Sequence, residues 1–220
     1  MNIKGAIFDM DGTLLDSLWG WEELWEWGGR KYLGVEGYRP DESVNKAVRT
    51  MVLSDAMEHI HTHCGIGRDA QELIDHFNEI LPVLYAEKFM IKPGAKEFLE
   101  YCRSRGIPMV LASATAKTFI DIALDTHDIR KYFDAVISCA EIGKGKEHPD
   151  VFLAALRILG TDIEDTYVFE DSYVALETAA AAGFGTVGVY DRYAFEQERL
   201  KASANFYIAE GETLMKLASL

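Results

Sequence analysis

Between residues 93 and 189, short apolar runs alternate with segments of helical periodicity, and this alternation strongly constrains the fold. Strands that alternate with helices form a parallel sheet covered by helices on both faces. The sequence therefore predicts an α/β fold with a doubly wound parallel sheet. The expected strands are Gly5–Phe8, Pro108–Ala112, Ala135–Ser138, Tyr167–Phe169 and Thr186–Val189, and the expected helices are Ala95–Ser104, Ala116–Asp125, Asp150–Leu159 and Val174–Ala182.

The segment of residues 17–90 interrupts this alternation, because its pattern is helical and contains no convincing strand. Within it, Cys64-Gly65-Ile66-Gly67 indicates a turn between two helices. We therefore expect an all-helical domain, residues 17–90, inserted into an α/β core formed by residues 1–16 and 91–220.

The first apolar run ends in Asp9-Met10-Asp11-Gly12-Thr13, which places two carboxylates at the end of a buried strand. Side chains alternate between faces along a strand, but where the strand becomes a loop both carboxylates can turn toward one site. Gly12 allows the sharp exit that this needs. Such a pair suits a divalent cation, a carboxylate nucleophile and a nearby general acid, which together can transfer a phosphoryl group through an aspartyl-phosphate.

Polar residues also follow the later strands, and ligands of parallel sheets bind at the carboxyl ends of the strands. Ser113 follows the second expected strand, Lys146 lies in the loop after the third, and Glu170-Asp171 follow the fourth. A hydroxyl can donate to a phosphoryl oxygen, a lysine can neutralise its charge, and carboxylates supply the oxygen ligands that Mg²⁺ prefers. The order of these groups predicts a phosphate site with a magnesium ion.

Charge and composition limit the partners and the location. Asp and Glu number 36 against 22 Lys and Arg, and the formal net charge is −14, so we expect neither nucleic acid nor a membrane as partner. An anionic substrate then requires a local cation or metal. The three cysteines lack a zinc spacing, and neither a secretory signal nor a membrane span is evident, so a cytoplasmic protein is expected. A monomer is compatible with the sequence.

The motifs resemble those of the haloacid dehalogenase superfamily, which consists mostly of phosphatases. Asp9-Met10-Asp11-Gly12-Thr13 matches the first motif and Ser113 falls at the second. Lys146, with His148-Pro149-Asp150 beyond it, resembles the third motif, and Glu170-Asp171-Ser172 matches the fourth. The resemblance implies a Rossmann-like core, and the inserted helices resemble the cap domain of that family in position.

The resemblance also implies a role for each motif residue. Asp9 is the nucleophile, and Asp11 protonates the leaving oxygen and then activates water, which requires a raised pKa. Ser113 and Lys146 hold the phosphate. The implied Mg²⁺ ligands are Asp9, the backbone carbonyl of Asp11, Asp171 and, directly or through water, Glu170.

Residue 11 separates the reaction classes of the superfamily. Its dehalogenases lack an acid there and its ATPases carry threonine, so Asp11 implies a phosphatase or a phosphomutase. β-Phosphoglucomutases carry a histidine at the position of Trp21, so hydrolysis of a small phosphomonoester, such as a sugar phosphate, is favoured over a hexose-phosphate mutase. The mutase needs a second phosphate site, for which Arg39, Lys46 and Arg49 are candidates. A non-catalytic binding protein on this fold is the alternative of another class.

Two further clusters lie in the insertion. Trp21 and Trp25 are one helical turn apart and predict packing within the cap, with an aromatic wall over the active site as the alternative. His59 and His63 share a helix face next to Cys64, but no third ligand is evident, so we expect a solvated face rather than a zinc site.

Overall fold

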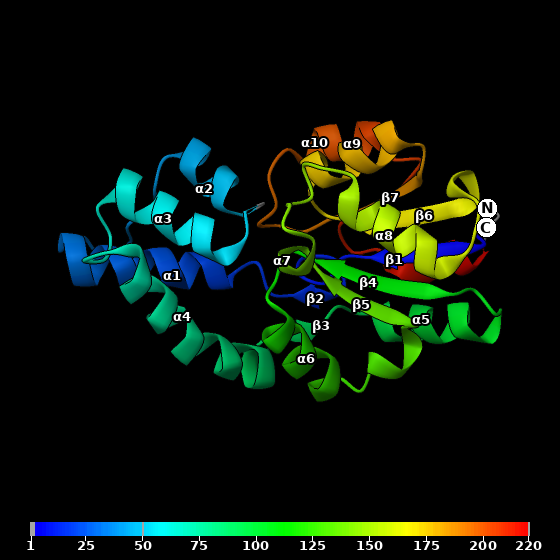
Figure 1. The fold of residues 1–220 in the computed structure, drawn as a ribbon, viewed down its shortest axis with the longest axis horizontal. Coiled ribbons are helices and arrows are strands. Elements are labelled where there is room, and N and C mark those ends of the chain that lie inside the picture. Colours follow the sequence, from blue (N-terminus) through cyan, green and yellow to red (C-terminus); the bar gives the residue numbers. More distant parts are fainter. Residues whose placement is uncertain (1–2, 50, 220) are drawn as a thin grey trace.

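The computed structural model describes residues 3–49 and 51–219 and contains a six-stranded sheet flanked by helices (Figure 1). The strands run in the order β5-β4-β1-β6-β7-β8, and every neighbouring pair is parallel. The predicted doubly wound α/β fold is therefore confirmed. The strands are β1 Gly5–Phe8, β4 Met109–Ser113, β5 Ala135–Ser138, β6 Thr166–Glu170, β7 Gly185–Val189 and β8 Phe206–Ile208.

Side chains of the central strand β1 alternate between the two faces of the sheet. Ala6 and Phe8 pack in the core cluster under α5 (Ala95–Ser104) and α6 (Lys117–Thr126). Ile7 packs in the cluster under α8 (Asp150–Leu159) and α9 (Tyr173–Ala182). Figure 1 shows these helices in two layers, one on each face. Burial on both faces explains why the strand is apolar at every position. The core helices are α5 Ala95–Ser104, α6 Lys117–Thr126, α7 Cys139–Ile142, α8 Asp150–Leu159, α9 Tyr173–Ala182 and α10 Gln197–Ser203.

Three of these core elements, α7, α10 and β8, were not expected from the sequence. Each has seven residues or fewer, so its pattern completes too few periods to be recognised. Short helical turns complete the core at Arg130–Tyr132, Ile163–Asp165 and Leu214–Ser219.

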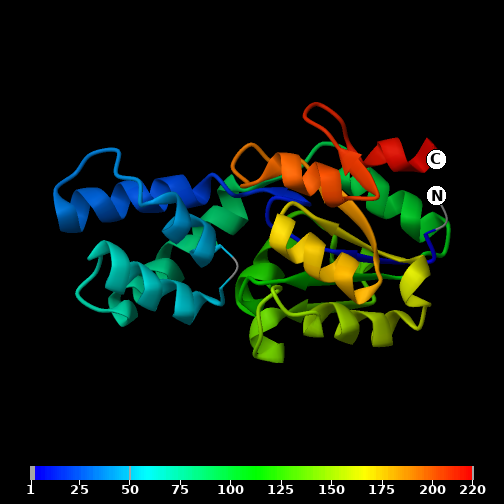
Figure 2. The ribbon, with the colours of Figure 1, turned by 90° about the horizontal axis from the view of Figure 1, so that it is seen from above.

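Between β2 (Leu15–Asp16) and β3 (Met90–Ile91), the described chain forms helices joined by loops and contains no strand. They pack around Trp25, Met57, Ile60 and Leu73, whose exposed fractions are 2% or less. Figure 2 shows these helices beside the sheet, beyond the ends of its strands. The helices are α1 Gly20–Gly28, α2 Glu42–Val48, α3 Leu53–Cys64 and α4 Ala70–Val83, with wider turns extending α1 over Gly29–Leu33 and α4 over Leu84–Lys88.

The chain leaves the sheet and returns to it through an antiparallel pair of short strands. In this pair, β2 Leu15–Asp16 lies against β3 Met90–Ile91. We propose this pair as the junction between the core, residues 1–16 and 91–220, and the cap, residues 17–90. No helix of the described chain is long and apolar enough to cross a bilayer.

Candidate active site

Asp9 lies directly beyond β1 at the carboxyl end of the sheet, and its backbone N–H donates to the carbonyl of Phe169 over 3.0 Å. Phe8 is in register with Phe169, so the loops after β1 and β6 leave the sheet side by side. Gly12 has a φ of +82°, and a Cβ here would lie 2.6 Å from Cγ of Asp171. Only glycine therefore lets the two loops approach this closely.

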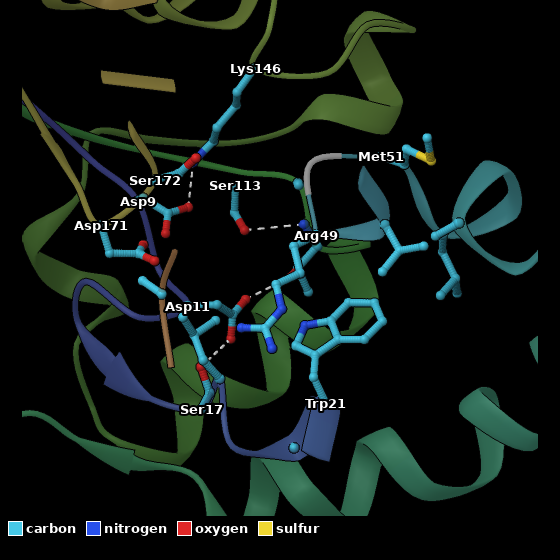
Figure 3. A pocket seen from close by; sticks show the side chains of 18 of the residues that line it. Asp9, Asp11, Ser17, Trp21, Arg49, Met51, Ser113, Lys146, Asp171 and Ser172 are labelled. Atoms are coloured by element: carbon cyan, nitrogen blue, oxygen red, sulfur yellow. Dashed lines mark hydrogen bonds and ion pairs between the residues drawn. The ribbon is translucent and has the colours of Figure 1, made fainter. Parts of the chain in front are cut away.

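Lys146 reaches Asp9 from the loop between α7 and α8. Its Nζ forms ion pairs with Oδ1 of Asp9 and Oε1 of Glu170, and its side chain is buried (Figure 3). Burial alone lowers the pKa of Lys146, but the charges of Asp9 and Glu170 outweigh it and raise the pKa above its ordinary value. Lys144 instead pairs with Asp150 at the surface over 2.8 Å, so Lys146 is the lysine of this loop that enters the site.

Asp9, Glu170 and Asp171 form a buried cluster in which one oxygen of each lies within 4.8 Å of the others. The Asp171 carboxylate accepts a hydrogen bond from Oγ1 of Thr13 over 3.2 Å, and it has no ion pair with any residue of 3–49 and 51–219. Burial and the charges of Asp9 and Glu170 raise the pKa of Asp171 well above its ordinary value. The single charge of Lys146 leaves three carboxylates incompletely neutralised, so a divalent cation with oxygen ligands fits this donor set.

The Asp11 carboxylate has its own set of partners. Oδ1 accepts hydrogen bonds from Ser17 Oγ at 2.7 Å and Tyr85 OH at 3.0 Å, and Oδ2 accepts one from Thr115 Oγ1 at 2.7 Å. Loss of surrounding water and the charge of Asp9 raise the pKa of Asp11, and these hydrogen bonds lower it by less. The raised pKa expected of a general acid is confirmed.

The Asp11 carboxylate does not belong to the cluster of Asp9, Glu170 and Asp171, so the proposed role of Asp11 as a metal ligand rests on its backbone carbonyl and stays a prediction.

Ser113, the last residue of β4, is buried at the carboxyl end of the sheet, where it lines a cavity. Its Oγ accepts a hydrogen bond from the N–H of Thr115 over 3.1 Å, which fixes the oxygen and leaves the hydroxyl proton to donate.

A cavity of about 220 Å³ extends from these groups into the inserted helices. Asp9, Asp11 and Lys146 line its core end, and Trp21 and Arg49 face them from the cap (Figure 3). The Arg49 side chain is 10% exposed and donates from Nη1 to the backbone carbonyl of Tyr193 over 2.7 Å. The cavity therefore lies between the two parts of the chain and is partly open to solvent, and Arg49 of the cap is hydrogen-bonded to a loop of the core.

Two sequence-predicted candidates lie elsewhere. Arg39 does not line the cavity and pairs with Glu22 near the surface. The rings of His59 and His63 stack 3.9 Å apart, while Nδ1 of His61 contacts the carbonyl of Ile66. Across the part of the chain that the structure describes, the cluster of Asp9, Glu170 and Asp171 is the only group of three or more His, Cys, Asp or Glu side chains placed to hold a metal. The structure therefore does not support a zinc site at the histidines of α3.

Three site residues were missed by the sequence patterns. Ser17 and Tyr85 hold Asp11, but both belong to a segment whose pattern indicates only helices and linkers. Lys92 donates to the carbonyls of Gly12 and Tyr190 and pairs with Asp191 over 2.9 Å, which braces the loop after β1. Its neighbours Pro93 and Gly94 indicate a turn, so the sequence pattern marks Lys92 only as part of the boundary between the inserted helices and the core.

A parallel sheet with buried carboxylates and a lysine at its carboxyl end is typical of α/β enzymes that act on phosphate groups. A family model described as haloacid dehalogenase-like hydrolase matches residues 3–183. The chain therefore belongs to the haloacid dehalogenase-like hydrolases, as the motifs predicted, and it is an enzyme.

Individual relatives agree with this assignment. The chain is 30% identical over 191 residues to hexitol phosphatase B of Escherichia coli (strain K12), covering 85% of this chain and 83% of that protein. It is 28% identical over 195 residues to the bifunctional riboflavin kinase/FMN phosphatase of Arabidopsis thaliana, covering 86% of this chain but 47% of that longer protein. The solved structure of β-phosphoglucomutase from Clostridium difficile has the same fold, with a TM-score of 0.75, 22% identity and coverage of 94% and 91%.

Proposed function

We propose that this enzyme is a Mg²⁺-dependent phosphatase that hydrolyses a small phosphomonoester through an aspartyl-phosphate on Asp9. The observation that carries the proposal is the contact of Lys146 with Asp9 inside a cluster of buried carboxylates. A carboxylate attacks a phosphate dianion poorly until positive charge offsets their repulsion, and this arrangement supplies that charge at the nucleophile. The phosphatase names of two relatives support the same reaction class.

In the first step, an oxygen of Asp9 attacks phosphorus and forms an acyl phosphate, while the bond from phosphorus to the leaving oxygen breaks. Asp11, protonated because its pKa is raised, gives its proton to that oxygen. Ser113 and Lys146 hold the non-bridging phosphoryl oxygens in place. The leaving group departs as a neutral alcohol.

In the second step, Asp11, now ionised, accepts a proton from a water molecule that attacks the phosphorus. The bond from phosphorus to Asp9 breaks, which regenerates the carboxylate and releases inorganic phosphate. Asp9, Glu170, Asp171 and the carbonyl of Asp11 would hold Mg²⁺, which when bound offsets the negative charge of the phosphoryl group.

Phosphate release from a panel of phosphorylated metabolites tests this function. Release should require Mg²⁺, stop with EDTA and disappear in Asp9→Asn. Asp16→Asn, which removes a carboxylate of β2 in the junction, is the matched control and should keep wild-type turnover. Activity in Asp9→Asn or in EDTA would overturn the mechanism.

A hexose-phosphate mutase is the second candidate, because Lys46 and Arg49 line the cap side of the cavity. Trp21 occupies the position where the mutases carry histidine, which favours hydrolysis. Conversion of a sugar 1-phosphate to the 6-phosphate without free phosphate would establish the mutase instead.

A further inference from the structure

The cap end of the cavity is lined mainly by apolar side chains. They come from all four inserted helices and together form an apolar wall on the cap side of the cavity. Figure 3 shows the Trp21 ring on the cap side of Asp11, and it packs against Phe77 with 6.2 Å between ring centroids. The lining includes Trp21, Leu24, Val48, Met51, Phe77 and Ile80.

Cap residues with a charged group or a hydroxyl are few in the lining of the cavity, and each already has partners. Among residues 17–49 and 51–90 they are Ser17, Lys46, Arg49 and Tyr85. The hydroxyls of Ser17 and Tyr85 both donate to Asp11, so they serve the proposed acid rather than a leaving group.

The two cationic side chains are also engaged. Lys46 pairs with Glu42 over 2.7 Å, and its Nζ lies 5.6 Å from the centre of the Phe195 ring. Arg49 donates to Asn45 over 3.2 Å and to the carbonyl of Tyr193 over 2.7 Å, and its guanidinium lies 4.8 Å from the centre of the Phe195 ring. Neither residue offers the set of free donors and acceptors that several sugar hydroxyls would need.

The size of the cavity limits what fits. An apolar cavity of about 150 Å³ accommodates a benzene ring. The cavity is partly open to solvent. With about 220 Å³ within it and the phosphoryl group at the core end, its cap end holds one six-membered ring or a branched chain of similar size.

We propose that the leaving group of the substrate is apolar, an alkyl or aryl alcohol of about one ring, rather than a polyhydroxylated sugar. This inference rests on the proposed phosphatase function. A hydroxyl buried against such a wall without a partner costs roughly tenfold or more in binding. A sugar would bury several of them, whereas an apolar ring gains by leaving water.

Cyclohexylmethyl phosphate and glucose 6-phosphate test this as a matched pair. Both are primary esters on a six-membered ring, and they differ chiefly in the ring hydroxyls and the ring oxygen. The electron-withdrawing oxygens make the sugar the better leaving group, so a preference for the apolar ester must come from binding. We expect kcat/KM to be at least tenfold higher for cyclohexylmethyl phosphate.

Trp21→Ala should reduce that ratio at least fivefold, because it removes an aromatic part of the apolar wall. Trp27→Ala is the matched control: its ring stacks on His76 with 3.5 Å between ring centroids, outside the lining of the cavity. The ratio should be unchanged in Trp27→Ala, which separates loss of the wall from general loosening of the cap.

Acetyl phosphate, whose leaving group is too small to fill the cap end, separates the two proposals. Asp9-dependent hydrolysis of acetyl phosphate with equal or better use of glucose 6-phosphate would overturn the apolar leaving group and keep the phosphatase. No hydrolysis of any of the three compounds would overturn both.

Discussion

The hydroxyl of Tyr85, at the end of the inserted segment, donates a hydrogen bond over 3.0 Å to Oδ1 of Asp11, in the loop after β1. The two residues are 74 positions apart, and the Tyr85 ring packs in the core cluster against Phe89 and Phe119. A hydrogen bond to a carboxylate favours its charged form. The proton affinity of the proposed acid therefore depends on a hydroxyl that the end of the inserted segment supplies.

Tyr85→Phe should raise the pKa of Asp11 further, because one of the three hydrogen bonds that lower it is lost. The reaction needs Asp11 protonated, so the alkaline limb of the kcat–pH profile should move upward by about one pH unit or less. Tyr101→Phe, which changes a tyrosine of α5 remote from Asp11, is the control. A limb that stays in place, or moves downward, would contradict the role of Tyr85.

Asp11→Asn should lower kcat about 10²- to 10⁴-fold for an alkyl phosphate, because the leaving alkoxide no longer receives a proton. For p-nitrophenyl phosphate, whose leaving group needs little protonation, the loss in the first step should be much smaller. Rapid-quench measurement of the first turnover with both substrates reads this difference. Equal losses on the two substrates would show that Asp11 acts through structure instead.

Asp171→Asn should have opposite effects on stability and on metal use. In chelator-treated protein at pH 7 it removes a buried carboxyl group whose charged form is disfavoured by burial, Asp9 and Glu170, so a gain of about 1 kcal/mol, or roughly 2–4 °C in Tm, is expected. Mg²⁺ affinity should fall at least tenfold by titration calorimetry. Asp162→Asn, at an exposed position, should change neither quantity.

The sign for Asp171 follows from its raised pKa. A carboxyl group with a higher pKa in the folded than in the unfolded protein costs stability increasingly as pH rises through this range. The gain from Asp171→Asn should therefore vanish below about pH 4, where both states are protonated. A gain that is the same at pH 3 and pH 7 would contradict this account.

Gly12→Ala should disable the site, because its Cβ would lie 2.6 Å from Cγ of Asp171 and its φ of +82° disfavours alanine. Gly160→Ala shares the positive φ, at +66°, but its Cβ would meet nothing within 4 Å. Both should lose about 1 kcal/mol to backbone strain. Only Gly12→Ala should also lose Mg²⁺ affinity and most turnover, so equal effects of the two variants would contradict the proposed contact.

Three of the four motifs could be found from sequence because they lie at or directly beyond the ends of the mainly apolar strands β1, β4 and β6. Phe8 and Phe169 are in register on neighbouring parallel strands, so the carboxylates that follow them lie close together. The α/β alternation predicts parallel strands but not their order, so the place of β1 beside β6 is known only from the structure. By contrast, Tyr85 and Ser17 reach Asp11 from the inserted segment, and its helical pattern does not indicate which of its residues contact the core.

Short elements escaped prediction for a related reason. The strands β2 and β3 have two residues each, and they exist because each pairs with the other at the junction. The histidines of α3 show the converse, since helical spacing placed His59 and His63 on one face, yet His61 turns to a backbone carbonyl. Spacing along a helix fixes a face, whereas a metal site also needs convergence from other elements.

The contact of Arg49 with the core uses the backbone carbonyl of Tyr193 rather than its side chain. Any residue at position 193 presents that oxygen, so position 193 can change without loss of this hydrogen bond, whereas the contact of Arg49 with Phe195 needs an aromatic ring. The side chain at position 193 can therefore vary during evolution while the hydrogen bond between the cap and the core is kept.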